Sequence, residues 1–254
     1  MKEITIPSPA GDIYAVLSPA VGETSSDKPL VVICHGLMMN SWLNPVRGIS
    51  DGFNAAGYDT LRFDFRGSGQ STGNVTEMTP LTEVGDLQAV ISYVQSALTR
   101  NIILCGHSLG GLVSLLTAAG LESRHQGEGV LKGLVMFAPA VNVETDSKAG
   151  RVGLETFDPV NIPDTVAVWG SELGRCYFTT AMNLDTYRTI SGYTGPLCVL
   201  MGERDKLVTC DYSSKINAAL PQAELHVIPK GDHLFSRGIR AKALDIALEF
   251  MSRL

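Results

Sequence analysis

Short apolar blocks alternate with amphipathic segments along the chain. Eight blocks have the length and composition of β-strands, at residues 2–6, 13–17, 30–34, 58–65, 102–105, 131–137, 197–201 and 225–228. The 3.6-residue spacing of apolar positions predicts a helix at 81–98, and further helices are expected at about 45–56, 109–119 and about 241–251. Strands that are apolar on both faces and separated by helices predict an α/β fold. They indicate a mostly parallel eight-stranded sheet covered by helices on both sides, with an antiparallel N-terminal hairpin.

The alternation stops between Pro139 and Pro196. Residues 141–193 show no clear strand or helix period, and a structureless loop of that length is improbable in a compact domain. We therefore expect a small cap, inserted after the sixth strand over one end of the sheet. Its six aromatic residues could form the cap's own core or line a ligand pocket, and the sequence leaves both open. These residues are Phe157, Trp169, Tyr177, Phe178, Tyr187 and Tyr193.

Length and charge limit the function classes. A chain of 254 residues is expected to form one domain, 1–254, with the cap at about 141–193. Acidic residues outnumber basic ones by 26 to 20, and no basic cluster stands out, so neither nucleic acid nor an anionic lipid surface is an expected partner. The N-terminus has no basic head followed by an apolar segment, so no cleaved secretion signal is expected.

A stretch without Asp, Glu, Lys or Arg, residues 101–121, is long enough to be a candidate membrane span. It opens with a β-rich block at 102–104 and is interrupted by Gly106-His107-Ser108 before it becomes helix-like. A buried strand followed by a buried helix explains this change of period better than one continuous helix. No membrane span is expected.

The five cysteines favour a reducing compartment. Their number is odd and none forms a CxxC pair, which argues against a disulfide framework and against a zinc site. We expect reduced thiols, a cytoplasmic location and no metal. Cys34, Cys105 and Cys198 lie in or at the end of apolar strands, where a thiol acts as a small hydrophobe.

The segment Gly106-His107-Ser108-Leu109-Gly110 fits the pattern GxSxG. It lies between a predicted strand that ends at Cys105 and a predicted helix that begins at Leu109. This is the context of a nucleophile elbow, a tight turn in which glycines allow close backbone approach and the serine projects above the sheet. Ser108 would stand at a helix N-terminus, where free amides favour developing negative charge.

A serine hydroxyl needs a base, and the base needs an orienting carboxylate. In elbow-type hydrolases the order is serine, acid, histidine, with each residue after a strand. Asp205 and His233 follow the last two predicted strands. Glu203 remains an alternative acid, whereas Asp232 is assigned to local turn chemistry. The other four histidines, including His107 as a packed elbow residue pointing elsewhere, are given structural roles.

Two backbone amides are candidate oxyanion donors. His35-Gly36 closes the third strand, and a loop at this place commonly supplies one donor, here Leu37, while the residue after the nucleophile, Leu109, supplies the other. A nearby segment, RGSGQSTG, has the spacing GxGxxxG rather than a dinucleotide or P-loop fingerprint. No cofactor is therefore expected.

The motifs HG at 35, FDFRGSGQS at 63–71, GHSLGG at 106–111, Asp205 and His233 together resemble the α/β-hydrolase superfamily. Within it, GLETFDPVNIPD at 153–164 and the ending DHLF look like the cinnamoyl/feruloyl esterase group. The chain departs from that group in having Leu109 where glutamine is frequent, and Leu37-Met38-Met39-Asn40 where related loops carry glycines.

The resemblance implies a serine carboxylesterase that acts on a small-molecule ester through an acyl-enzyme. The acyl group would be a hydroxycinnamate or a related aromatic or short acid under the cap, and Trp169, Tyr177 and Asp146 are candidate contacts. A monoacylglycerol lipase, a thioesterase or an acyl-peptide hydrolase on the same scaffold is the alternative, and a non-catalytic ligand-binding relative is a further one. Fold alone names no substrate, and a homodimer stays open as the assembly.

Overall fold

One central sheet of eight strands organises the computed structural model, which describes residues 1–22, 28–98, 100–124, 129–236 and 238–254. The order across the sheet is β1-β2-β4-β3-β5-β6-β11-β12. The strands are β1 (Lys2–Ser8), β2 (Gly11–Ser18), β4 (Thr60–Phe63), β3 (Leu30–Cys34), β5 (Ile102–His107), β6 (Leu131–Phe137), β11 (Leu197–Gly202) and β12 (Glu224–Ile228).

The sheet is parallel from β4 to β12 and antiparallel at its first edge. β1 pairs with β2 and β2 with β4 in antiparallel register, and every following pair is parallel. The mostly parallel eight-stranded sheet predicted from the apolar blocks is therefore confirmed. Because parallel strands end at the same edge, the segments that follow β3, β5, β11 and β12 meet there.

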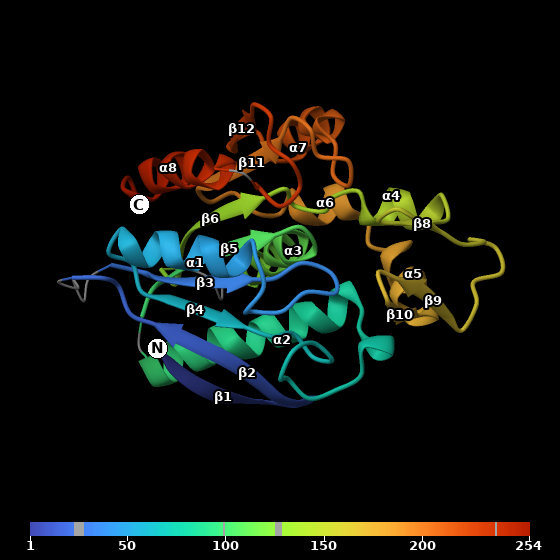
Figure 1. The fold of residues 1–254 in the computed structure, drawn as a ribbon, viewed down its shortest axis with the longest axis horizontal. Coiled ribbons are helices and arrows are strands. Elements are labelled where there is room, and N and C mark those ends of the chain that lie inside the picture. Colours follow the sequence, from blue (N-terminus) through green and yellow to red (C-terminus); the bar gives the residue numbers. More distant parts are fainter. Residues whose placement is uncertain (23–27, 99, 125–128, 237) are drawn as a thin grey trace.

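Helices cover both faces of the sheet (Figure 1). In β3, Val31 and Ile33 belong to the core under α1 and α8, whereas Val32 and Cys34 belong to the core under α2 and α3. Successive side chains of a strand point to opposite faces, so a strand buried on both sides must be apolar throughout. The four helices are α1 (Val46–Ala55), α8 (Ile239–Met251), α2 (Pro80–Tyr93) and α3 (Leu109–Ser123).

The predicted cap follows β6 and lies beyond the carboxyl ends of the strands (Figure 1). It is built from short elements, which explains why no period was visible in the sequence. Its elements are α4 (Val143–Lys148), β7 (Arg151–Val152), β8 (Glu155–Thr156), β9 (Thr165–Val168), β10 (Ser171–Gly174), α5 (Arg175–Ala181) and α6 (Thr186–Ile190).

The cap aromatics divide between the two expected roles. The ring centroids of Phe157 and Phe178 are 4.3 Å apart, and those of Tyr177 and Phe178 are 5.2 Å apart, so these side chains form a small core inside the cap. Trp169 and Tyr177 also line a cavity at the carboxyl end of the sheet.

Some elements differ from the prediction. The strand expected at 58–65 is shortened to β4 because the chain turns away at its end, where the Phe65 N–H donates to Nε2 of His35 at 3.0 Å. The helix expected at 81–98 is α2 followed by a π-helical segment, η2 (Val94–Leu98). Outside the cap, three short helices among the described residues were not predicted, namely η1 (Val75–Glu77), η3 (Cys210–Tyr212) and α7 (Ser213–Ala219).

The charge-free stretch at 101–121 is β5 and α3 with a turn between them, as the change of period predicted. Within the described ranges, no helix combines the length and hydropathy needed to cross a bilayer. Cys34, Cys105 and Cys198 are buried free thiols inside the core.

Candidate active site

Ser108 lies in the tight turn between β5 and α3. Its φ of 54° and ψ of −121° form a conformation that a residue with a side chain rarely adopts. A Cβ at position 106 would stand 2.5 Å from the carbonyl oxygen of Gly110, and one at position 110 would overlap the carbonyl oxygen of His35. Glycines at 106 and 110 therefore let strand and helix approach closely, and this tight turn leaves the Ser108 side chain at the carboxyl edge of the sheet.

Three side chains from three loops form one hydrogen-bonded chain. Nε2 of His233 lies 3.0 Å from Oγ of Ser108, and Nδ1 of His233 lies 2.7 Å from Oδ2 of Asp205. Asp205 follows β11 and His233 follows β12, so parallel pairing of these strands brings the two residues to the edge where Ser108 stands. The structure thus brings together the serine, acid and histidine that the sequence singled out.

The Asp205 carboxylate is buried but fully engaged. Oδ1 accepts the backbone N–H groups of Leu207 at 2.8 Å and Val208 at 2.9 Å, while Oδ2 faces His233. A carboxylate accepts hydrogen bonds, so Nδ1 of a neutral His233 carries its proton. Nε2 is then free to accept the hydroxyl proton of Ser108.

The alternative acids lie elsewhere. Oε2 of Glu203 accepts the backbone N–H of Lys230 at 2.7 Å. Oδ1 of Asp232 accepts the backbone N–H of Ser236 at 2.8 Å, which is the local turn chemistry expected of it. Among the candidate carboxylates, Asp205 is the one hydrogen-bonded to the His233 ring.

Two other histidines support the site through the backbone, which the sequence did not indicate. Nε2 of His35 accepts the Phe65 N–H, so its Nδ1–H donates to the carbonyl oxygen of Gly36 at 2.8 Å and fixes the loop after β3. Nε2 of His107 lies 2.8 Å from the carbonyl oxygen of His233. Burial and the nearby His233 lower the pKa of His107 to about 3, so it is neutral at ordinary pH.

The sequence also assigned structural roles to the two remaining histidines. His226 lies within β12, and His125 lies outside the described residues. His107 is packed in the elbow as predicted, and its ring bonds to the backbone of His233 rather than to Ser108. The loop after β12 contacts both residues of the turn, because His233 bonds to His107 through its backbone and to Ser108 through its ring. These residues are far apart in the sequence, so no local pattern indicated the contact with His107.

The expected oxyanion donors flank the serine. A Cβ at position 36 would lie 3.1 Å from Cβ of Ser108, so the loop that carries Leu37 passes directly beside the serine. Leu109 is the first residue of α3, and the first N–H groups of a helix have no acceptor inside the helix. We therefore expect both backbone amides to face a negatively charged oxygen that forms next to Ser108.

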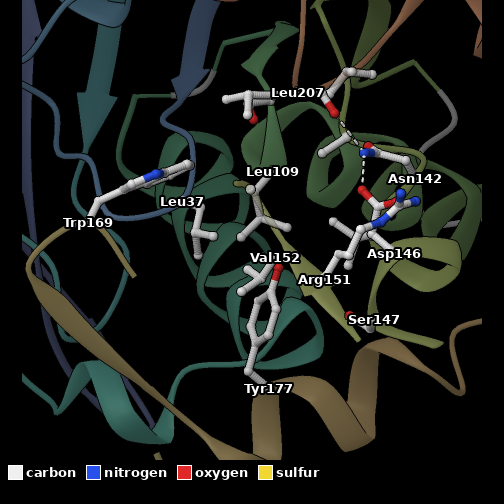
Figure 2. A pocket seen from close by; sticks show the side chains of 15 residues that line it. Leu37, Leu109, Asn142, Asp146, Ser147, Arg151, Val152, Trp169, Tyr177 and Leu207 are labelled. Carbon is white, nitrogen blue, oxygen red and sulfur yellow. Dashed lines mark hydrogen bonds and ion pairs between the residues drawn. The ribbon is translucent and has the colours of Figure 1, made fainter. Parts of the chain in front are cut away.

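Two cavities meet at Ser108, and both are bounded by Trp169, Leu37 and Leu207. The first lies under the cap and has a volume of about 50 Å³. Figure 2 shows its walls, with Tyr177 rising from α5 toward Leu109 and Val152. The second has a volume of about 440 Å³ and is bounded by the loops after β3 and β12.

All three cap residues suggested by the sequence line the first cavity. Trp169 stands at the tip of the β9–β10 hairpin, with its indole over Gly153, where no side chain would fit. Burial raises the pKa of Tyr177, which keeps its hydroxyl protonated. Asp146 is held by Nδ2 of Asn142 at 2.6 Å and by the guanidinium of Arg151 at 2.8 Å (Figure 2). The Arg151 contact was not foreseen from the sequence.

In the part of the chain that the structure describes, no group of three or more His, Cys, Asp or Glu side chains is arranged to hold a metal ion.

The chain is similar to known proteins in both sequence and fold. The family model described as serine aminopeptidase, S33, matches residues 25–161, a range that includes Ser108 and ends before Asp205 and His233. A 31.7 kDa protein encoded in the traX-finO intergenic region of Escherichia coli is 33% identical over 95 residues, which cover 36% of this chain and 32% of that protein. The match therefore spans about a third of this curated relative.

Solved structures share the fold over nearly the whole chain. Est1E from Butyrivibrio proteoclasticus, with ferulic acid bound, is 25% identical with a TM-score of 0.87, covering 98% of this chain and 99% of its own. XC6422 from Xanthomonas campestris, described as an α/β serine hydrolase without a lid, is 21% identical with a TM-score of 0.66, covering 99% and 93%.

Proposed function

Because the chain belongs to the serine aminopeptidase S33 family and has the α/β-hydrolase fold, we propose that it is a serine hydrolase that cleaves carboxylic esters through a covalent acyl-enzyme. The observation that carries the proposal is the hydrogen-bonded chain from Ser108 through His233 to Asp205, with distances of 3.0 and 2.7 Å. A nucleophile, a base and an orienting carboxylate in this geometry support acyl transfer.

The proposed reaction has two halves. Oγ of Ser108 attacks the ester carbonyl while Nε2 of His233 takes its proton, and Asp205 stabilises the imidazolium that forms. The tetrahedral intermediate collapses, the bond to the alcohol oxygen breaks, and His233 gives its proton to that oxygen. Water then attacks the acyl-serine with His233 again as base, which releases the acid and restores the serine.

Backbone amides of Leu37 and Leu109 would bind the oxyanion in both halves. Such donors act where charge develops, and loss of one costs about 3–4 kcal/mol of transition-state stabilisation. Their side chains can be apolar because only the N–H groups take part. This accounts for Leu109 at a position where the resembling esterases frequently have glutamine.

The cavity under the cap is the proposed acyl site, and its size bears on the acyl group. Its volume of about 50 Å³ suits a short acyl chain, whereas a cavity that holds benzene measures about 150 Å³. Est1E, which has a similar fold, binds ferulic acid. We therefore propose short acyl esters as substrates. Aromatic acyl esters such as hydroxycinnamates would bind when the hairpin that carries Trp169 moves outward.

A substrate panel, in which the simple esters share methanol as their alcohol, tests the class. Methyl acetate, methyl butyrate, methyl cinnamate and methyl ferulate are compared with a medium-chain monoacylglycerol, an acyl thioester, an acyl-peptide and an aminoacyl anilide. The aminoacyl anilide is included because the family description names aminopeptidases. We expect the methyl esters to have the highest kcat/KM.

Mass spectrometry of the intact protein supplies the second readout. An added mass equal to the acyl group, present during turnover and absent after it, supports an acyl-enzyme. A preference for the thioester, glyceride, peptide or anilide moves the assignment to another acyl hydrolase on this scaffold. Absence of any covalent intermediate and of turnover favours a non-catalytic ligand-binding protein.

A further inference from the structure

The second cavity at Ser108 has a different chemistry from the first. It is about 440 Å³, and its lining is mostly apolar. Two large apolar side chains in it, Trp169 and Leu234, are 48% and 41% exposed, although exposure of such residues to water is unfavourable. Met38, Met39 and Leu207 complete the apolar wall.

The proton transfer from His233 determines which half of an ester, acyl or alcohol, binds in this cavity. His233 must deliver its proton to the alcohol oxygen when the ester bond breaks, so the alcohol has to lie on the His233 side of Ser108. His233 and its neighbours Asp232 and Leu234 line the second cavity and are absent from the lining of the first. The acyl group then points the other way, toward Leu109 and the cap.

The polar groups of the second cavity offer little to a polyhydroxy alcohol. Oδ1 of Asp232 already accepts the Ser236 N–H, and Nε2 of His107 already donates to the His233 carbonyl, which leaves Oδ2 of Asp232 as an acceptor outside the reacting groups. The remaining polar side chains, Ser108 and His233, are the reacting groups. Most hydroxyl groups of a bound sugar or glycerol would face the apolar wall and lose water without gaining a partner, which costs binding free energy.

The backbone conformation at Met38 also supports an apolar binding site. Its φ is 56°, in the left-handed region that favours glycine or asparagine, and the turn is closed by the Met39 N–H, which donates to the carbonyl oxygen of Gly36 at 3.2 Å. A glycine would relieve the strain, yet the chain carries a long apolar side chain that lines the cavity. Strain kept at a ligand-contacting position is a feature of functional sites.

We propose that this cavity is the binding site for the alcohol half of the ester and that it selects apolar alcohols, alkyl or aryl, over polyhydroxy alcohols. The inference rests on the proposed ester hydrolysis. It names Met38 and Leu234 as specificity-determining residues.

The test uses acetate esters of methanol, propanol, hexanol, benzyl alcohol and ethylene glycol. All share one acyl-enzyme, so kcat/KM reports the step in which the alcohol is present. We expect kcat/KM to rise by about two- to fourfold for each methylene buried. Propyl acetate should exceed 2-hydroxyethyl acetate, which has nearly the same size, by about tenfold or more.

Variants assign the effect to Met38. Met38→Gly and Met38→Asn suit the left-handed backbone and remove the apolar side chain. In these variants the increase in kcat/KM with alcohol length should be reduced by half or more. Met38→Leu keeps an apolar side chain and should keep the dependence. In all three Met38 variants, the order of kcat/KM for methyl acetate, methyl propionate and methyl butyrate should be the same as in the parent protein. Leu81→Ala, at an exposed position of α2 outside both cavities, is the matched control, and thermal unfolding shows that each variant folds.

Each outcome decides a different point. Equal kcat/KM for propyl and 2-hydroxyethyl acetate overturns the inference and leaves ester hydrolysis standing. A change in the acyl series instead of the alcohol series means that the two halves bind the other way round, which also overturns it. If no ester is hydrolysed, the proposed function and this inference fall together.

Discussion

Nε2–H of His107 donates a hydrogen bond to the backbone carbonyl of His233, 2.8 Å away, and the two ring centroids are 4.8 Å apart. The residue before the serine therefore holds the loop of the histidine that contacts the serine. Burial first, and the nearby His233 second, lower the pKa of His107 to about 3, so the ring is neutral above about pH 4 and its proton is on Nε2, where the carbonyl accepts it.

Removing that donor should misplace His233. His107→Phe keeps an aromatic ring but leaves the His233 carbonyl without its hydrogen-bond donor. We expect kcat to fall about tenfold or more with a smaller change in KM, because small displacements of a catalytic base slow the reaction strongly. His107→Gln retains an N–H donor and should recover part of the rate. Steady-state kinetics on both variants tests this, and equal kcat for His107→Phe and the parent protein would contradict it.

The orienting carboxylate can be tested against its nearest competitor. Asp205→Asn should lower kcat by about 10³- to 10⁴-fold, because the amide no longer stabilises the imidazolium or holds the ring tautomer. Glu203→Gln is the matched control, since its carboxylate contacts the Lys230 backbone and should leave kcat within about twofold. Kinetics on one ester decides between them, and the reverse result would transfer the role to Glu203.

A buried carboxyl outside the reaction gives a pH-dependent prediction. Burial, reinforced by the neighbouring Asp86, raises the pKa of Glu83 well above its usual 4.5, and its Oε2 has no hydrogen-bond partner among the described residues. The folded state therefore binds a proton that the unfolded state has lost, and stability falls as pH rises above 4.5, by at most about 1.4 kcal/mol per pH unit until the folded-state pKa is passed.

Glu83→Gln removes this loss because the amide is neutral at every pH. We expect the variant to unfold at a higher temperature than the parent protein at pH 7–8, with the difference shrinking toward pH 4. Thermal unfolding at several pH values measures it, with exposed Glu77→Gln as the control for loss of one charge. A variant that is less stable at pH 8 would mean that Glu83 is ionised and stabilising.

The sequence was informative wherever local chemistry dictates structure. Strands such as β3 must be apolar throughout because Val31 and Ile33 pack on one face and Val32 and Cys34 on the other. The elbow at Ser108 was visible because only glycine fits at 106 and 110, where backbone meets backbone. The places of Asp205 and His233 followed from the end of each strand.

What the sequence did not reveal depends on contacts between distant segments. The bond from His107 to the His233 carbonyl joins residues 126 positions apart. The cap helices and hairpins are too short to show a period, and they are held by packing such as that of Phe157 on Phe178. The narrowness of the cavity under the cap, where Arg151 pairs with Asp146, likewise required the folded arrangement.

The cap residue Tyr177 allows a test of acyl recognition. Its protonated hydroxyl is directed toward the cavity under the cap (Figure 2), where it can bond a hydroxyl on an aromatic acyl group. Tyr177→Phe should lower kcat/KM for methyl 4-hydroxycinnamate relative to methyl cinnamate by about two- to tenfold, the value of one hydrogen bond. Tyr187→Phe, outside both cavities, is the control. An unchanged ratio would remove Tyr177 from acyl recognition.

We propose that the hydroxyl of Ser108, which is hydrogen-bonded to His233, forms the acyl-enzyme. The most direct test is the turnover of p-nitrophenyl acetate by Ser108→Ala, a change that removes one oxygen from the cavity and is checked for folding by thermal unfolding. We predict a loss of about 10⁴-fold or more in kcat while the protein remains folded. Turnover by folded Ser108→Ala at a rate comparable to that of the parent protein would contradict the account.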